Sequence, residues 1–142
     1  MAAFGWSTGD IVATISLVNR IVQCIGGAHN ARDHFQELLS ELQGLSRALG
    51  KISELAQTPE QTSEIQALKF ASCSCCETLQ RFYEKIRPFE DSLGAASTQS
   101  KLKAVPRMVR WELLIKKEVP ELRSYLVAHV GYLNLRLSTA VL

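Results

Sequence analysis

Apolar residues recur at alternating steps of three and four residues over most of this sequence, and this spacing is the strongest constraint on its fold. Such a repeat places its members on one face of an α-helix. It appears in three long stretches: Phe35, Leu38, Leu42, Leu45, Leu49 and Ile52; Ile65, Leu68, Cys75, Leu79, Phe82 and Ile86, with Ser72 at the missing step; and Val119, Leu122, Leu126, Val130, Leu133, Leu137 and Val141. A shorter series of the same kind occupies residues 11–25. No segment shows the strict alternation typical of half-buried strands, so the sequence predicts an all-α fold.

Residues that begin or end helices divide the chain into five predicted helices, at residues 8–25, 31–56, 60–87, 101–115 and 119–141. Gly26 ends the first, because glycine readily adopts the left-handed conformation that closes a helix. Pro59 separates the second from the third, and the small polar run 92–100 predicts a loop. Residues 116–118 predict a corner, with Pro120 in the first turn of the last helix. Short connections favour an antiparallel bundle of four long helices plus one shorter helix.

Composition is that of a globular protein, since 46% of the 142 residues are hydrophobic and 21% are charged. This length predicts a single domain, residues 1–142. The net charge is only +2, which argues against nucleic acid as a partner. The charge is unevenly distributed: residues 101–117 hold six basic residues and one acidic residue, whereas residues 1–86 hold seven basic and nine acidic residues.

The sequence contains four cysteines, Cys24, Cys73, Cys75 and Cys76. Three of them lie within one helical turn, which makes a poor disulfide framework and predicts free thiols in a reducing, cytoplasmic compartment. Zinc binding by Cys73 and Cys76 together with His29 or His34 stays open, as does palmitoylation of either thiol if exposed, but the position of Cys75 on the apolar repeat favours packing. No secretory signal is visible, and no uncharged apolar stretch reaches the ~18 residues of a bilayer span.

No catalytic motif is present. Gly26-Gly27 lacks the third glycine and the Lys-Ser/Thr pair of a phosphate-binding loop, and no Glu precedes a His by three residues as in di-iron bundles. The three histidines, His29, His34 and His129, have no nucleophile or carboxylate partner by spacing. The sequence therefore predicts a binding protein and not an enzyme, with no cofactor, no metal and no small-molecule substrate.

The predicted helix over residues 101–115, with the lysines that follow it, is basic and amphipathic. Leu102, Val105, Val109 and Leu113 fall on one side, and the basic residues cluster on the adjoining flank. The candidate contacts to lipid headgroups are Lys103, Arg107, Arg110, Lys116 and Lys117. A basic amphipathic helix of this kind docks on anionic membranes, while a solvated face of the bundle is the alternative reading.

The N-terminal segment is the second functional candidate. Two aromatic residues precede the first helix, and small residues recur at every fourth position in Gly5, Gly9 and Ala13, a spacing that allows close helix approach in membranes. The candidate membrane-insertion or self-association residues are Phe4, Gly5, Trp6, Gly9, Ile11, Ile15, Val18 and Val22. Packing of the two aromatic side chains against the bundle is the alternative.

Several segments resemble one family of fungal domains. They are Phe4–Val12, Phe35–Leu42 with the following Leu45–Leu49, Lys69-Phe70-Ala71 beside the cysteines, Lys85–Glu90, Trp111, and His129–Leu137. The pattern covers nearly the whole chain. It resembles the N-terminal domains of fungal STAND-type immune receptors and ubiquitin-like-module proteins, a group similar to the HeLo and HeLo-like helical bundles.

This resemblance implies a non-enzymatic signalling domain of programmed cell death and heterokaryon incompatibility. Such a domain is a quiet monomer until a receptor partner oligomerises it and drives it to the membrane. The implied partners are a second copy or a related receptor bundle and anionic lipids, with recruitment from the cytoplasm to the plasma membrane. Arg20 and Asp10 argue against simple insertion of the first helix, because charges in a bilayer are costly. The alternative function is an adaptor that assembles helix to helix without entering lipid.

Overall fold

The computed structural model describes residues 8–26, 32–60, 62–89 and 110–141. The helices are α1 (Thr8–Gly26), α2 (Arg32–Ala56), α3 (Ser63–Cys73), α4 (Cys76–Ile86) and α7 (Val119–Val141). A 3-10 turn, Arg87–Phe89, follows α4, and a π-helical segment, Leu114–Glu118, leads directly into α7. Residues 110–113 are also helical. The all-α class predicted from the apolar repeats is confirmed.

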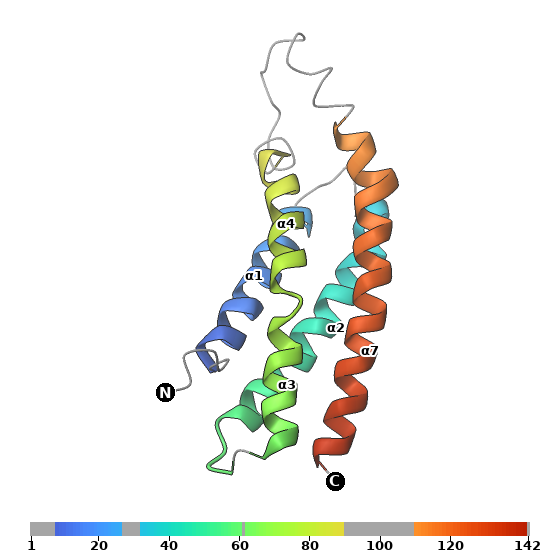
Figure 1. Cartoon of the computed structure of the whole chain (residues 1–142). Coiled ribbons are helices and arrows are strands. Elements are labelled where there is room, and N and C mark those ends of the chain that lie inside the picture. The colour runs from blue at the N-terminus through green and yellow to red at the C-terminus, as the bar shows by residue number, and fades with distance from the viewer. Residues whose placement is uncertain (1–7, 27–31, 61, 90–109, 142) are drawn as a thin grey trace.

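The long helices lie side by side and alternate in direction along the chain (Figure 1). α1 and the α3–α4 pair run one way, and α2 and α7 run the other way. α2 packs against α1, α3 and α7, while α1 also packs against α3 and α4. The end of α4 and the described residues 110–118, which lead into α7, therefore lie at the same end of the molecule.

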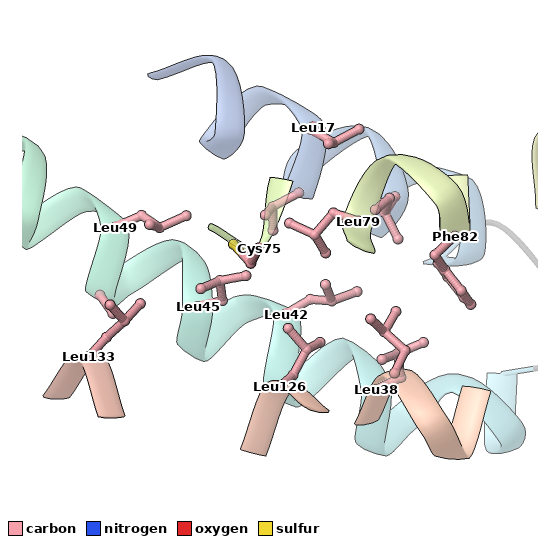
Figure 2. Close-up of a cluster of buried hydrophobic side chains, with 14 of the residues drawn as sticks. Leu17, Leu38, Leu42, Leu45, Leu49, Cys75, Leu79, Phe82, Leu126 and Leu133 are labelled. Carbon is pink, nitrogen blue, oxygen red and sulfur yellow. The ribbon is translucent and has the colours of Figure 1, made fainter. Parts of the chain in front are cut away.

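α2 supplies the centre of the hydrophobic core. All six members of its apolar repeat are completely buried: Phe35, Leu38, Leu42, Leu45, Leu49 and Ile52. In Figure 2, Leu42 of α2 lies between Leu79 of α4 and Leu126 of α7, so side chains from all three helices meet in the core. Burying one such side chain stabilises the fold by about 1.5–3 kcal/mol.

The predicted single helix at residues 60–87 is wrong at two points. The helix begins only at Ser63, because the Thr62 side chain accepts a hydrogen bond from the Ile65 backbone N–H at 3.3 Å and so caps α3. A turn then separates α3 from α4, where the Ser74 hydroxyl donates to the Ala71 carbonyl at 2.7 Å. Side-chain bonds of this kind compete with the regular helical pattern. The apolar repeat crosses the turn undisturbed, since all its members are buried.

The predicted corner at residues 116–118 is also wrong, because the chain stays helical there. Leu114 and Val119 are both buried, although residues five apart on a regular α-helix point about 140° apart. The π-helical segment brings them to the same side, since its wider turn bonds the Val119 N–H to the Leu114 carbonyl. Pro120 suits this position because it has no N–H to donate to the carbonyl four residues earlier.

Candidate functional site

Three of the predicted headgroup contacts lie exposed at the beginning of the last long helix. Arg110 opens its described part, and Lys116 and Lys117 lie in the π-helical segment. The Lys116 side chain is 78% exposed, and its ammonium is 4.0 Å from the Glu112 carboxylate. The other two predicted contacts, Lys103 and Arg107, lie outside the described residues. The three described residues span about 10 Å along the helix axis, at 1.5 Å per residue.

α4 brings two further basic residues to the same end of the bundle. Arg87 is exposed directly after α4, and Lys85 lies in its last turn. The Lys85 ammonium is 2.8 Å from the Glu118 carboxylate, so an ion pair joins α4 to the π-helical segment. The Glu118 side chain is only 19% exposed. The ion pair thus keeps the largely buried Glu118 carboxylate beside the Lys85 ammonium.

We call these five residues, Lys85, Arg87, Arg110, Lys116 and Lys117, the basic end of the bundle. Figure 1 shows the end of α4 and the beginning of the last long helix on the same side of the molecule. Residues 90–109, which join these two helices in sequence, contain three more basic residues. The sequence could not associate α4 with this segment, because the contact between them is tertiary.

A groove of about 210 Å³ lies beside the basic end, between α4 and the first turns of α7. Its apolar lining comes from Phe82 and Leu122, and the Lys85–Glu118 ion pair lies at it. Tyr125 also lines the groove, and partial burial raises the pKa of its hydroxyl. Charged side chains of both signs line the groove, so it offers no uniform field that would select an anion or a cation.

The second predicted segment, in α1, is part of the core. Ile11 and Val18 are completely buried, and Ile15 and Val22 are partly buried. Gly9 is exposed, whereas Phe4, Gly5 and Trp6 lie outside the described residues. α1 packs against three other helices. The apolar face that would enter a membrane is therefore covered by protein in this structure.

The cysteines are largely buried, which confirms the predicted packing and removes Cys73 as an exposed acylation site. Cys73 and Cys75 are 3% and 0% exposed. Burial raises the pKa of Cys73 to about 11, and burial followed by the neighbouring Cys76 raises the pKa of Cys75 to about 12. Both thiols are therefore protonated and weakly nucleophilic near neutral pH. Within the described part of the chain, His, Cys, Asp and Glu form no group of three or more placed to hold a metal ion.

His129 is half-buried on α7 and stacks on Tyr125, with ring centroids 5.6 Å apart and an interplanar angle of 10°. Burial lowers its pKa, so the ring is neutral near pH 7. Its Nε2 atom is buried and finds no hydrogen-bond partner among the described residues. The stacking on Tyr125 holds this neutral ring in place.

One exposed feature was not predicted. α7 presents large apolar side chains on its outer side, with Val127 53%, Tyr132 44% and Leu135 67% exposed. The available sequence signal was the absence of any Asp, Glu, Lys or Arg from Ser124 to Leu135. A solvent-facing helix normally carries charges on its outer side, so this run was the sign of a second surface.

No protein-family model, curated protein or solved structure matches this chain. Within the described residues, no helix combines the length and apolar character that crossing a membrane requires.

Proposed function

We propose that this chain is a non-enzymatic signalling domain that attaches, as a folded bundle, to anionic membrane surfaces through its basic end. The observation that carries the proposal is the exposure of Arg110, Lys116 and Lys117 at the same end of the molecule as Arg87. Basic residues from two helices are thereby exposed at one end of the bundle. A phospholipid headgroup layer is a broad anionic surface that can contact all of them at once.

The expected strength follows from the number of exposed charges. Each basic residue near an anionic leaflet contributes about 1 kcal/mol. The four exposed residues Arg87, Arg110, Lys116 and Lys117 therefore supply at most roughly 4 kcal/mol, equivalent to about a 1,000-fold preference over a neutral surface, and the Glu112 carboxylate beside Lys116 reduces this. The effect is confined to about one Debye length, so it falls as salt rises. Membrane attachment of this kind is weak and reversible, and oligomerisation would strengthen it through multivalency.

The packing of α1 favours attachment without insertion. Six apolar α1 side chains are buried: Ile11, Leu17, Val18, Ile21, Cys24 and Ile25. At about 1.5–3 kcal/mol for each large aliphatic side chain, releasing α1 would cost roughly 10 kcal/mol. That is comparable to the whole stability of a typical domain, about 5–15 kcal/mol. Insertion of α1 would therefore require a triggering partner that offsets this cost.

A second candidate function is the adaptor, which binds a second copy or a related receptor bundle and never contacts lipid. The observation that favours it is the exposed apolar surface of α7, marked by Val127 and Leu135. The resemblance to HeLo-like domains supports a role in fungal cell-death signalling for either candidate. Both functions are non-enzymatic, and neither needs a cofactor or a small-molecule substrate.

Co-sedimentation with vesicles tests the proposal. We expect the chain to bind phosphatidylserine-containing vesicles at low salt, to lose this binding at high salt, and to ignore pure phosphatidylcholine. The double variant Lys116→Gln/Lys117→Gln should bind about 30-fold more weakly, because it removes about 2 kcal/mol of attraction. Arg47→Gln/Lys51→Gln on α2 is the matched control, since it removes the same charge from exposed residues elsewhere.

Equal binding by the two double variants would show that the basic end is not the contact. Binding to neither vesicle type would leave the adaptor as the remaining function. Salt-resistant binding to pure phosphatidylcholine would also contradict the proposal, because it would indicate an apolar rather than an electrostatic contact.

A further inference from the structure

Two of the clustered cysteines bracket the turn between α3 and α4. Cys73 is the last residue of α3, and Cys76 is the first residue of α4. Between them, Ser74 has φ −64° and ψ −23°, and Cys75 has φ −83° and ψ −7°. These are the angles of the two central residues of a type I turn, whose first and fourth Cα atoms lie less than ~7 Å apart. The turn therefore holds Cys73 and Cys76 at a backbone separation suited to a disulfide, which spans about 4.4–6.8 Å between Cα atoms.

The side chains of Cys73 and Cys76 also project to one side of the chain, because residues three apart in helical backbone share a face. Their thiols interact: burial is the main cause of the raised pKa of Cys73, Asp10 adds to it, and the neighbouring Cys76 raises it further. Cys75 lies apart from this pair. It is completely buried among the core side chains of Figure 2, and its thiol donates to the Ser72 carbonyl at 3.2 Å.

The two thiols of the pair differ in their access to solvent. Cys76 is half-buried, whereas Cys73 is only 3% exposed. A reagent in solution therefore reaches Cys76 first, and Cys73 is placed to react with whatever forms there. This combination of an accessible thiol and a protected second thiol beside it is typical of redox-sensing cysteine pairs.

Cys73 connects the turn to α1. A hydrogen bond joins its thiol to the Thr14 hydroxyl, which itself donates to the Asp10 carbonyl at 2.9 Å. Thr14 is 1% exposed, so this polar contact lies inside the bundle. Any movement of Cys73 toward Cys76 therefore acts on the packing of α1 against the turn.

We propose that Cys73 and Cys76 are a redox-active dithiol, which closes to a reversible disulfide under oxidation and thereby loosens α1 from the turn between α3 and α4. The oxidant is a low-molecular-weight disulfide such as oxidised glutathione. This inference does not rest on membrane attachment or on the basic end. It gives the cysteine cluster a role beyond packing.

The reaction proceeds by two thiol–disulfide exchanges. The Cys76 thiolate attacks one sulfur of oxidised glutathione, which forms a mixed disulfide and releases one glutathione that takes up the proton lost by Cys76. The Cys73 thiolate then attacks Cys76 Sγ, which forms the Cys73–Cys76 bond and releases the second glutathione with the proton lost by Cys73. Two protein thiols are oxidised, and one disulfide is reduced to two thiols. The raised pKa of Cys73 slows the second exchange, but its fixed position beside Cys76 offsets this.

Closing the bond requires the turn to tighten. Cβ atoms three residues apart on a helix are about 5–6 Å apart, whereas a disulfide needs about 3.5–4.5 Å. Strained disulfides are readily reduced, which suits a reversible switch and not a permanent crosslink. The same movement draws Cys73 away from Thr14, so oxidation weakens the contact with α1.

Mass spectrometry of the whole chain tests the bond. The chain is incubated with oxidised glutathione, denatured and alkylated, and trypsin then releases residues 70–81, which contain all three clustered cysteines. We expect this peptide to lose two hydrogen atoms, to carry no glutathione and to be alkylated only at Cys75. A disulfide that includes Cys75 or Cys24, or a peptide with no disulfide, would overturn the proposal.

Two variants test the order of the exchanges. Cys73→Ser should trap glutathione on Cys76, because the second thiol is gone, and Cys76→Ser should leave Cys73 unmodified in the folded chain. Cys24→Ser is the matched control, since Cys24 is a buried cysteine outside the turn and its loss should leave closure unchanged. Circular dichroism checks that each variant is folded. Glutathione on Cys73 of the folded Cys76→Ser chain would contradict the assigned order.

Hydrogen–deuterium exchange without lipid tests the effect on α1. We expect the amides from Ile11 to Val18 to exchange at least about threefold faster in the oxidised chain than in the reduced chain, and dithiothreitol to reverse the change. The Cys76→Ser chain, treated in the same way, should show no change. Equal exchange in the oxidised and reduced wild type would overturn the link to α1. Because these measurements contain no lipid, their failure would leave the proposal for the basic end unchanged.

Discussion

Ile21 of α1 provides the sharpest test of how the N-terminal helix is held. Its side chain is completely buried. Ile21→Ala deletes three carbon atoms, worth about 0.8 kcal/mol each in transfer free energy, or roughly 2.4 kcal/mol. The cavity left behind adds to this, because surrounding side chains relax only partially. We therefore expect the free energy of unfolding to fall by about 3–4 kcal/mol.

Urea denaturation followed by far-ultraviolet circular dichroism measures this change. The control is Val12→Ala on the same helix, where the side chain is 50% exposed. That substitution should change the free energy of unfolding by less than about 0.5 kcal/mol. In thermal melts, the Ile21→Ala protein should unfold roughly 10 °C below the wild type, at about 3 °C per kcal/mol for a chain of this size.

Similar effects of Ile21→Ala and Val12→Ala would refute the reasoning. That result would mean that α1 does not depend on burial of this face, and that its release toward a membrane is easy. A smaller slope of unfolding free energy against urea in the Ile21→Ala protein would also be informative, because it would show that α1 had already detached before the main transition.

Three further predictions concern individual side chains. Burial lowers the pKa of His129, so the unfolded chain takes up a proton at this site at a higher pH than the folded chain does. Acidification from about pH 7 to about pH 5 should therefore destabilise the fold. Urea melts at both pH values should show a smaller loss for His129→Phe, and equal losses would contradict this. Thiol labelling of the native chain should modify the half-buried Cys76 well before Cys73 or Cys75, because burial raises the pKa of these two thiols to about 11 and about 12. Labelling of Cys75 faster than Cys76 would contradict the place of Cys75 in the core. Thr62→Ala should cost about 1 kcal/mol in urea melts by removing the cap of α3, and an effect no larger than that of Ser63→Ala would argue against the cap.

The apolar repeats predicted the core well, because helix geometry alone dictates which residues share a face. Every member of the second repeat is buried, including Ser72, whose hydroxyl donates to the Leu68 carbonyl at 2.6 Å. The repeat did not reveal Leu17 and Ile21 of α1. These residues are buried because α1 packs against three helices and so covers a wider part of its surface than one apolar stripe.

Two local features could not be predicted from periodicity. The turn between α3 and α4 depends on side-chain hydrogen bonds of Ser74 and Cys75 to nearby carbonyls. The π-helical segment before Pro120 inserts one extra residue into the helical pattern, which sequence reasoning interpreted as a corner. Both features compete with regular helix geometry over a few residues, where local hydrogen bonding outweighs the long-range pattern.

The candidate site was only partly predictable. Exposure of Arg110, Lys116 and Lys117 followed from their place beside an apolar stripe, but the contribution of Lys85 required knowing that α4 ends beside them. The outer face of α7 was visible in the sequence only as an absence of charge. An absence of charge is a weaker signal than a motif, because buried helices share it.

Hydrogen–deuterium exchange of the α1 backbone amides, with and without phosphatidylserine vesicles, tests the central claim most directly. The claim is that the chain attaches to an anionic surface through its basic end while α1 stays packed in the bundle. We therefore expect the amides from Ile11 to Ile25 to exchange slowly and equally in both samples, under conditions where co-sedimentation shows the chain to be bound. Faster exchange along this whole stretch on binding, or a change in α1 that persists in Lys116→Gln/Lys117→Gln, would contradict the account.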